Sequence, residues 1–189
     1  MKNVIAASLM VLTLGATAAT ADVKVGLGFG IDAWSSLSGP LDGGTTPQTT
    51  IRVPIDFDMG LRIEPELGFT FSENEDNTEK NKYKGVTLAV GAYYNFLKVD
   101  KVNIYAGGRL GLSKGKHEFT NKNNGASNYT NDVDAIALQG LVGAEYFFVE
   151  NMSFAAQAGV ELRSATESRA DYDETSTGTV STLIIRYFF

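Results

Sequence analysis

Alternation of apolar and polar residues between Ile51 and Phe71 is the feature that most constrains the fold of this chain. Every odd position in this stretch is apolar, and every charged side chain lies at an even position. Because successive side chains of a strand point to opposite faces, the pattern indicates a β-ribbon with one apolar face. The stretch is too long for one strand, so it must contain a turn, and residues 58–60 (Asp-Met-Gly) are the best place for it.

A three-residue turn keeps the apolar residues of both strands on one face, provided that Gly60 takes the left-handed position. The turn also sets the register of the hairpin, and two pairs of opposite charges follow from that register. Pro54 and Pro65 fall inside the strands, where each removes a ladder hydrogen bond, so we expect a bulge or a break near them. The expected cross-strand pairs are Phe57 with Leu61, Asp56 with Arg62, and Arg52 with Glu66.

The same alternation recurs along the chain and predicts eight strands. Long polar stretches and short turns connect them in strict alternation, so the two kinds of connection lie at opposite ends of the sheet. The predicted strands are residues 23–34, the two arms of 51–71, 83–96, 102–113, 133–148, 152–163 and 179–189, and the predicted long loops are 35–48, 72–82, 114–131 and 164–178.

The hairpin made by residues 83–96 and 102–113 also has a predicted register. If Phe96 pairs with Val102, Tyr93 lies opposite Tyr105 on the polar face, and Gly91 lies opposite Gly107 beside them. The glycines on this face have two interpretations. They either make room for tyrosine rings or open a narrow lumen.

The first residues predict export from the cytoplasm. Lys2 precedes an apolar run that ends in small residues, which is typical of a cleaved signal peptide over residues 1–21. Removal of this leader takes away one lysine and no acid, which changes the net charge from −6 to −7. An acidic surface disfavours nucleic-acid binding, and the absence of cysteine excludes disulfides and thiol chemistry.

The final strand carries a resemblance to a known class of proteins. Leu183, Ile185, Tyr187 and Phe189 share one face, and Arg186 lies on the other. This pattern resembles the assembly signal of bacterial outer-membrane barrels, which implies recognition by the barrel-assembly machinery and by periplasmic chaperones during biogenesis. The chain as a whole resembles the small eight-stranded family that includes the OmpA transmembrane domain, OmpX and the opacity proteins.

The resemblance implies an all-β fold, an eight-stranded antiparallel up-and-down transmembrane barrel over residues 22–189, located in the bacterial outer membrane. Its apolar face contacts lipid, with aromatic residues near the short turns. The polar face points inward, where an unpaired charge is costly, so we expect a network of paired charges. Its predicted members are Arg52, Asp56, Arg62, Glu64, Glu66, Arg109, Glu145, Glu161, Arg163 and Arg186.

The chemistry-bearing residues do not form a catalytic motif. His117 is the single histidine and lies in a predicted loop. Acidic loop residues such as Glu73, Glu75 and Asp76 have the ligand type that a divalent cation prefers, although such loops are usually only solvated. We therefore expect no catalytic residue, no cofactor and no metal.

The expected function is a non-enzymatic structural or surface-interaction role, in which four long outside loops contact an extracellular ligand or surface partner. Two alternatives remain open at this point. One is a narrow porin-like channel for small solutes. The other is a soluble periplasmic ligand-binding barrel with its apolar face inward.

Overall fold

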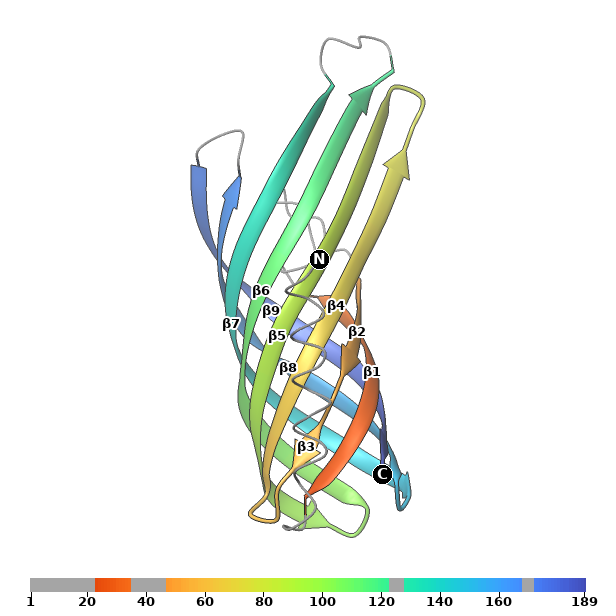
Figure 1. Cartoon of the computed structure of the whole chain (residues 1–189), viewed down its shortest axis with the longest axis vertical. Coiled ribbons are helices and arrows are strands. Elements are labelled where there is room, and N and C mark those ends of the chain that lie inside the picture. The colour runs from red at the N-terminus through yellow and green to blue at the C-terminus, as the bar shows by residue number, and fades with distance from the viewer. Residues whose placement is uncertain (1–22, 35–46, 123–127, 168–171) are drawn as a thin grey trace.

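The computed structural model shows one antiparallel sheet that closes on itself (Figure 1), and it describes residues 23–34, 47–122, 128–167 and 172–189. Consecutive strands pair, and β1 also pairs with β9, which completes an eight-strand ring because β2 and β3 occupy one place. The all-β barrel prediction is confirmed. The strands are β1 (Lys24–Trp34), β2 (Gln48–Arg52), β3 (Ile55–Asp56), β4 (Leu61–Glu75), β5 (Glu79–Val99), β6 (Val102–Asn121), β7 (Tyr129–Val149), β8 (Met152–Glu167) and β9 (Tyr172–Phe188).

The first hairpin has the predicted register. Asp56 pairs with Arg62 and Arg52 pairs with Glu66, and the amide of Phe57 donates a hydrogen bond to the carbonyl of Leu61. Gly60 has a φ of 82°, the left-handed conformation that the three-residue turn requires. The turn chemistry and the alternation together were therefore sufficient to fix this pairing.

The two prolines share a single interruption. Strand pairing stops between β2 and β3, at Val53 and Pro54, as expected for Pro54. Pro65 lies inside β4 with no break there, which differs from the expectation. Its carbonyl accepts a hydrogen bond from the amide of Val53, so its nitrogen also faces Val53. The donor that proline lacks is therefore missing at the break between β2 and β3, and the ladder to β5 is unaffected.

The predicted register of β5 against β6 was wrong. The strands continue to Val99 and Val102, which pair across a shorter turn, and Asp100 in that turn has a φ of 50°. A bulge between Asn95 and Leu97 then shifts the register, so that Tyr93 lies opposite Gly107. Tyr93 therefore faces a glycine, and a Cβ placed on Gly107 would lie 2.8 Å from its ring.

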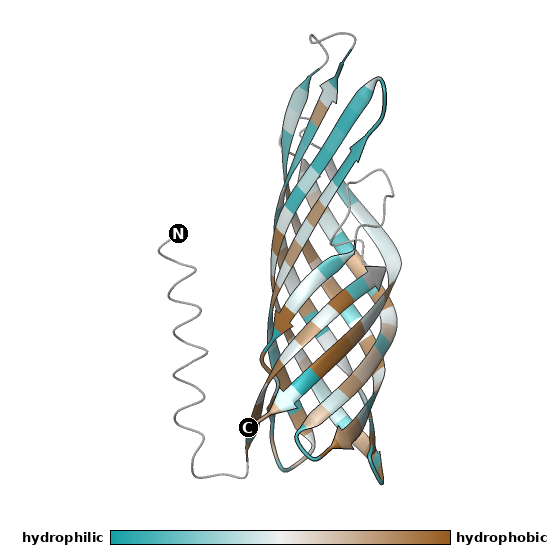
Figure 2. Cartoon of the chain, turned by 90° about the vertical axis from the view of Figure 1, so that its right-hand side faces the viewer, coloured by the Kyte–Doolittle hydropathy of each residue, from teal (hydrophilic) through white to brown (hydrophobic). Residues whose placement is uncertain are grey.

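Three of the four predicted long loops, residues 72–82, 114–131 and 164–178, were wrong in another respect, because most of their described residues lie in strands. β4 to β7 continue well beyond the rest of the ring as a protruding sheet (Figure 1). Hydrophilic residues dominate this protrusion, whereas hydrophobic residues concentrate in the barrel body (Figure 2). Only short turns or undescribed segments connect these strands, and the predicted signal peptide and residues 35–46 lie outside the described residues.

The apolar residues cover the outside of the barrel body, as the transmembrane orientation predicts. Phe29, Val90 and Leu112 are each about half exposed. On β6 the outward apolar run extends from Val102 to Leu112, which at about 3.3 Å per residue and a tilt of about 40° spans roughly 25 Å of membrane. A soluble carrier would need this face inside, so the structure argues against that alternative. No helix within the described ranges is long and apolar enough to cross a membrane.

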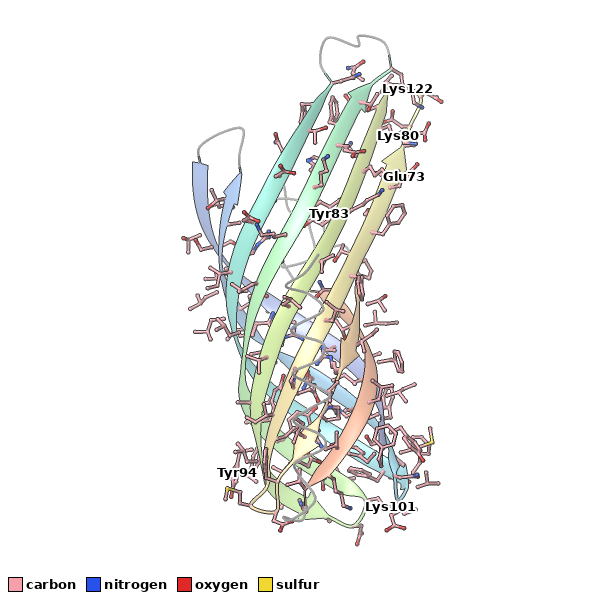
Figure 3. The ribbon with its side chains drawn as sticks, in the orientation of Figure 1. Glu73, Lys80, Tyr83, Tyr94, Lys101 and Lys122 are labelled. Atoms are coloured by element: carbon pink, nitrogen blue, oxygen red, sulfur yellow. The ribbon has the colours of Figure 1, made fainter. Side chains whose placement is uncertain are left out.

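Aromatic side chains gather at the short-turn end. Tyr94 and Lys101 both lie at this end, which is opposite to the end that carries Lys80 and Lys122 (Figure 3). The exposed aromatic residues predicted at this end all face outward. They are Phe57, Tyr94, Phe96, Tyr146, Phe148, Phe154, Tyr187 and Phe189. Their level fits a lipid–water interface.

Candidate functional site

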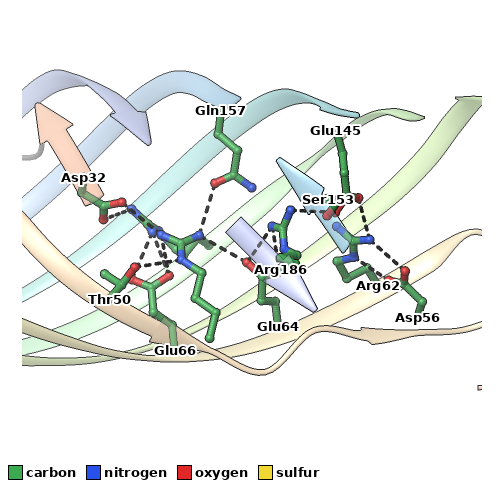
Figure 4. A network of polar contacts seen from close by, with 12 residues as sticks. Asp32, Thr50, Asp56, Arg62, Glu64, Glu66, Glu145, Ser153, Gln157 and Arg186 are labelled. Carbon is green, nitrogen blue, oxygen red and sulfur yellow. Dashed lines mark hydrogen bonds and ion pairs between the residues drawn. The ribbon is translucent and has the colours of Figure 1, made fainter. Parts of the chain in front are cut away.

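The interior of the barrel body contains a continuous chain of charged side chains (Figure 4). It begins near the short-turn end, where the guanidinium of Arg62 contacts Asp56 on the neighbouring strand and Glu145 across the barrel, the latter at 2.8 Å. The rings of Tyr105 and Phe188 lie 5.7 and 5.6 Å from the same guanidinium carbon. Arg62 is thus held by two carboxylates and by two aromatic faces.

Arg186 and Glu64 continue the chain toward the middle of the barrel. Nη1 of Arg186 lies 3.1 Å from Glu145, whose carboxylate also accepts a 2.6 Å hydrogen bond from the hydroxyl of Ser153. Nε and Nη2 of Arg186 both donate to Glu64, at 2.9 and 2.8 Å for the closest oxygen. This two-point contact fixes the plane of the guanidinium as well as its position.

The second half of the chain is built around Arg52 and Arg109. Arg52 contacts Glu64 at 3.2 Å, and its Nη2 lies 3.0 Å from both Asp32 and Glu66. Arg109 binds the same two acids, Glu66 at 2.9 Å and Asp32 at 3.0 Å. Asp32 and Glu66 are therefore shared between two arginines, which links strands β1, β2, β4 and β6 through side chains alone.

Two of the predicted charges join the group in other ways. Glu161 accepts a hydrogen bond from the amide of Gln139, and the oxygen of that amide accepts one from Nε of Arg109 at 2.5 Å. Arg163 is buried two residues further along β8, toward the protruding end. Asp56 is the one partly exposed member of the predicted set, with 21% of its side chain accessible.

Burial explains why these groups must be connected. Seven groups of this network are at most 1% exposed: Arg52, Arg62, Arg109, Arg186, Glu64, Glu145 and Asp32. Removing one ion from water costs several kcal/mol even after relaxation, and only close partners with good geometry offset that cost. Among these seven groups the offset comes from shared partners, because each of them contacts at least two groups of opposite charge.

Tyrosine rings fill the space beside the inward glycines. A Cβ placed on Gly143 would lie 2.6 Å from the ring of Tyr105, and those placed on Gly91 and Gly107 would meet the ring of Tyr93. The two rings contact each other edge to face, with centroids 5.6 Å apart. These glycines therefore accommodate side chains, which is the first of the two interpretations considered above.

Some contributors to the interior lay beyond the sequence prediction. Thr50 and Gln157 both bond to Arg52, at 3.0 and 3.3 Å, and Ser153 bonds to Glu145. Their inward position on their strands was the only available signal, and it does not distinguish a partner from a spacer.

His117 lies in β6 rather than in a loop. Its ring is 3.3 Å from the Asn81 side chain and edge to face with Tyr129.

Among the described residues, no group of three histidine, cysteine or acidic side chains is arranged to hold a metal ion. Glu73 and Glu75 instead pair with Lys80 at 2.6 and 3.0 Å, and these contacts lower the pKa of both carboxyls. At Glu75 the hydrogen bond with Lys122 lowers the pKa most, and the one with Lys80 comes second.

The four residues of the candidate assembly signal form an outward row, three of them on β9 and Phe189 directly after it. Leu183, Ile185, Tyr187 and Phe189 are between 43% and 81% exposed, and the rings of the last two lie 5.4 Å apart. β9 is also the strand that closes the ring against β1.

A closed ring of antiparallel strands, apolar outside and charged inside, defines an integral β-barrel protein of the bacterial outer membrane, embedded in its lipid. The family can also be stated. The family model of the outer membrane protein beta-barrel domain matches residues 4–182, and the chain belongs to this family. A search of curated protein sequences gives no significant match.

Solved structures share the fold at low sequence identity. A major outer membrane protein from Thermus thermophilus is 13% identical, with a TM-score of 0.58 over 89% of this chain and 100% of that one. Ail, the attachment invasion locus protein of Yersinia pestis, is 15% identical, with a TM-score of 0.54 over 89% of this chain and 99% of that one. A second structure of Ail, in complex with the heparin analogue sucrose octasulfate, has a TM-score of 0.52 at 15% identity over 88% and 97% of the two chains.

Proposed function

We propose that this protein is a non-enzymatic, non-conducting membrane anchor that holds its protruding strands and loops at the cell surface. The observation that carries the proposal is the connected ion-pair chain inside the barrel, from Asp56 to Arg109. A path for solutes would have to break several of these contacts. An interior used for support leaves the protruding sheet as the part available for interaction.

The proposal is tested by conductance in planar lipid bilayers. We expect no stable stepwise current from the refolded protein at neutral pH. The Arg109→Gln variant tests for a path that the interior charges close, and we expect no current from it either. Stable steps whose size changes in Arg109→Gln or Glu145→Gln would instead establish the narrow channel.

The proposed surface role concerns the hairpin between β4 and β5. Its charged tip is tied to β6, because Lys122 contacts both Glu75, at 2.9 Å, and the carbonyl of Asp76. A tip with its own ion pairs can keep a defined shape without contact to the membrane. The recognised molecule would be an extracellular ligand or a surface partner. Ail, one of the structures of like fold, has been solved with a heparin analogue, so a polyanionic sugar is a reasonable first probe.

Shortening this hairpin tests the surface role separately from the anchor. Replacing residues 73–82 by a short turn should leave the heat-sensitive gel mobility of the folded barrel unchanged and reduce adhesion of cells to a heparin-coated surface. The other protruding connections are then shortened one at a time. Adhesion equal to that of the wild type in every variant would contradict the surface role.

We also propose that the last strand is read by the barrel-assembly machinery, with periplasmic chaperones delivering the chain. Support comes from the outward row that ends in Phe189. Deleting Phe189 should lower the amount of folded protein in the outer membrane several-fold, while refolding of the purified variant in detergent stays near normal. An equal loss in both assays would show that Phe189 acts through stability instead.

A further inference from the structure

The strands β4 to β7 have two chemically different faces where they protrude from the barrel body. The face that continues the lipid-facing wall carries charges that lie opposite one another, such as Glu73 with Lys82 and Lys116 with Asp132. The face that continues the interior carries two cross-strand rows without a carboxylate, lysine or arginine. These inner rows are Ser72, Tyr83, His117 and Asn131, and next to them Asn74, Asn81, Phe119 and Tyr129.

The rings of the inner rows form a continuous aromatic surface. Tyr129 stacks on Phe119 with centroids 5.0 Å apart, and it meets His117 edge to face at 6.0 Å. Such pairs stabilise a sheet, but these three rings stay partly accessible although they lie above the apolar belt. Tyr83 lies on the same protruding sheet (Figure 3), and its ring is buried over Gly85, 3.3 Å from where a Cβ there would lie. Tyr83 is therefore on the barrel side of the accessible rings.

Amide groups border these rings. The side-chain oxygen of Asn81 lies 3.3 Å from a ring nitrogen of His117. Asn131 is only 8% exposed, and its side-chain oxygen has no hydrogen-bond donor among the described residues. β8 pairs with β7 only as far as Val133, so in the described part of the chain Asn131 has a neighbouring strand on one side alone. A buried amide oxygen without a donor costs free energy, which a donor from a bound molecule would recover.

The chemistry of the inner rows matches that of a neutral sugar. The C–H face of a pyranose ring packs on an aromatic ring, and sugar hydroxyls both donate and accept hydrogen bonds, as amide and hydroxyl side chains do. An acyl chain would leave the amides without partners, and an ionic ligand would find no lysine, arginine or carboxylate in these rows.

We propose that the inner rows bind a neutral oligosaccharide. One sugar ring packs against Phe119 and Tyr129, and a sugar hydroxyl donates a hydrogen bond to the side-chain oxygen of Asn131. The inference rests on the placement of the protruding sheet at the cell surface, proposed above. It does not depend on the charged tip of the hairpin between β4 and β5, which is the part assigned to a polyanionic sugar.

The test is biolayer interferometry with the full protein. The immobilised probes are neutral oligosaccharides of glucose, galactose and N-acetylglucosamine. The detergent must not have a sugar headgroup, because such a headgroup would compete for the rings. We expect the wild type to bind at least one of the three probes. Phe119→Ala should weaken that binding about tenfold, the order of size of one aromatic contact.

Two further variants separate recognition from folding. Phe119→Tyr keeps the ring and should bind as the wild type does. Thr120→Ala is the matched control, since Thr120 is exposed on the opposite face of the same strand, and it should also leave binding unchanged. Heat-sensitive gel mobility checks that each variant is folded.

Three results would overturn the proposal: no binding of any of the three probes, full binding by Phe119→Ala, or an equal loss in Thr120→Ala. Heparin is measured in parallel and should bind equally to the wild type and to Phe119→Ala. Loss of neutral-sugar binding alone would therefore leave the surface role of the charged tip standing, and failure to bind heparin alone would leave the inner rows standing.

Discussion

At the scale of single residues, Glu64 is the member of the interior on which most depends. It joins Arg52 to Arg186, and so links the two halves of the charged chain. Neutralising it leaves two buried guanidinium groups with one acidic partner fewer each. Most of the lost stability therefore comes from the buried guanidinium groups that remain without a full set of partners, and less from the missing contact itself.

We predict that Glu64→Gln lowers the free energy of unfolding by about 3 to 5 kcal/mol, the range for removing one partner of a buried pair. Urea titration in lipid vesicles, followed by gel mobility without boiling, measures this. Glu150→Gln is the control, since Glu150 is exposed in the turn between β7 and β8. A loss no larger than that of the control would mean that water or rearranged neighbours replace Glu64.

Gly143 provides a second test, of packing instead of charge. An added methyl group would collide with the buried ring of Tyr105, so Gly143→Ala should destabilise the barrel by about 1 to 3 kcal/mol, the usual cost of overpacking. Gly140→Ala on the same strand is the matched control, because its Cβ would meet only Val160, at 4.0 Å. The same urea titration measures both. Equal destabilisation would show that strand propensity, and not the tyrosine, sets the cost.

At the scale of the element, the sequence was informative only where the strand contacts lipid. Inside the membrane each strand must present apolar residues to the lipid. Residues such as Leu88 and Val90 therefore show which positions of β5 face outward. Above the membrane both faces of β5 contact water, so the apolar alternation ends. Polar residues such as Lys80 and Lys82 follow, and their composition is typical of a loop. The bulge near Phe96 was equally invisible, because it changes the pairing without changing the composition.

The turn between β4 and β5 gives a prediction about pH. The amide of Thr78 and then that of Glu79 donate hydrogen bonds to the Asp76 carboxylate, which lowers its pKa. A carboxyl with a lowered pKa stabilises the folded turn above the ordinary value of about 3.9, and that contribution is lost as the pH falls through the lower value.

The NMR shift of the Thr78 amide proton measures this effect. It should stay constant as the pH falls to about 4 and then change, and the change should be absent in Asp76→Ala. A midpoint at or above the ordinary aspartate pKa would contradict the hydrogen-bonded turn.

At the scale of the whole molecule, the interior connects strands that are distant in sequence. Arg186 of β9 binds Glu64 of β4, and Arg62 of β4 binds Glu145 of β7. Sequence reasoning could supply the hairpin pairs, such as Arg52 with Glu66, because a turn fixes them. It could not supply partners across the lumen, because these depend on the tilt of the strands and on the length of each side chain.

The central claim is that apolar side chains face lipid and charged side chains are enclosed, and a cysteine scan tests it most directly. The chain has no cysteine, so single substitutions at Thr87, Leu88, Ala89 and Val90 can each carry a fluorophore in lipid vesicles that contain a bromolipid quencher. The account predicts strong quenching at 88 and 90 and little at 87 and 89. Uniform quenching, or the opposite alternation, would contradict it.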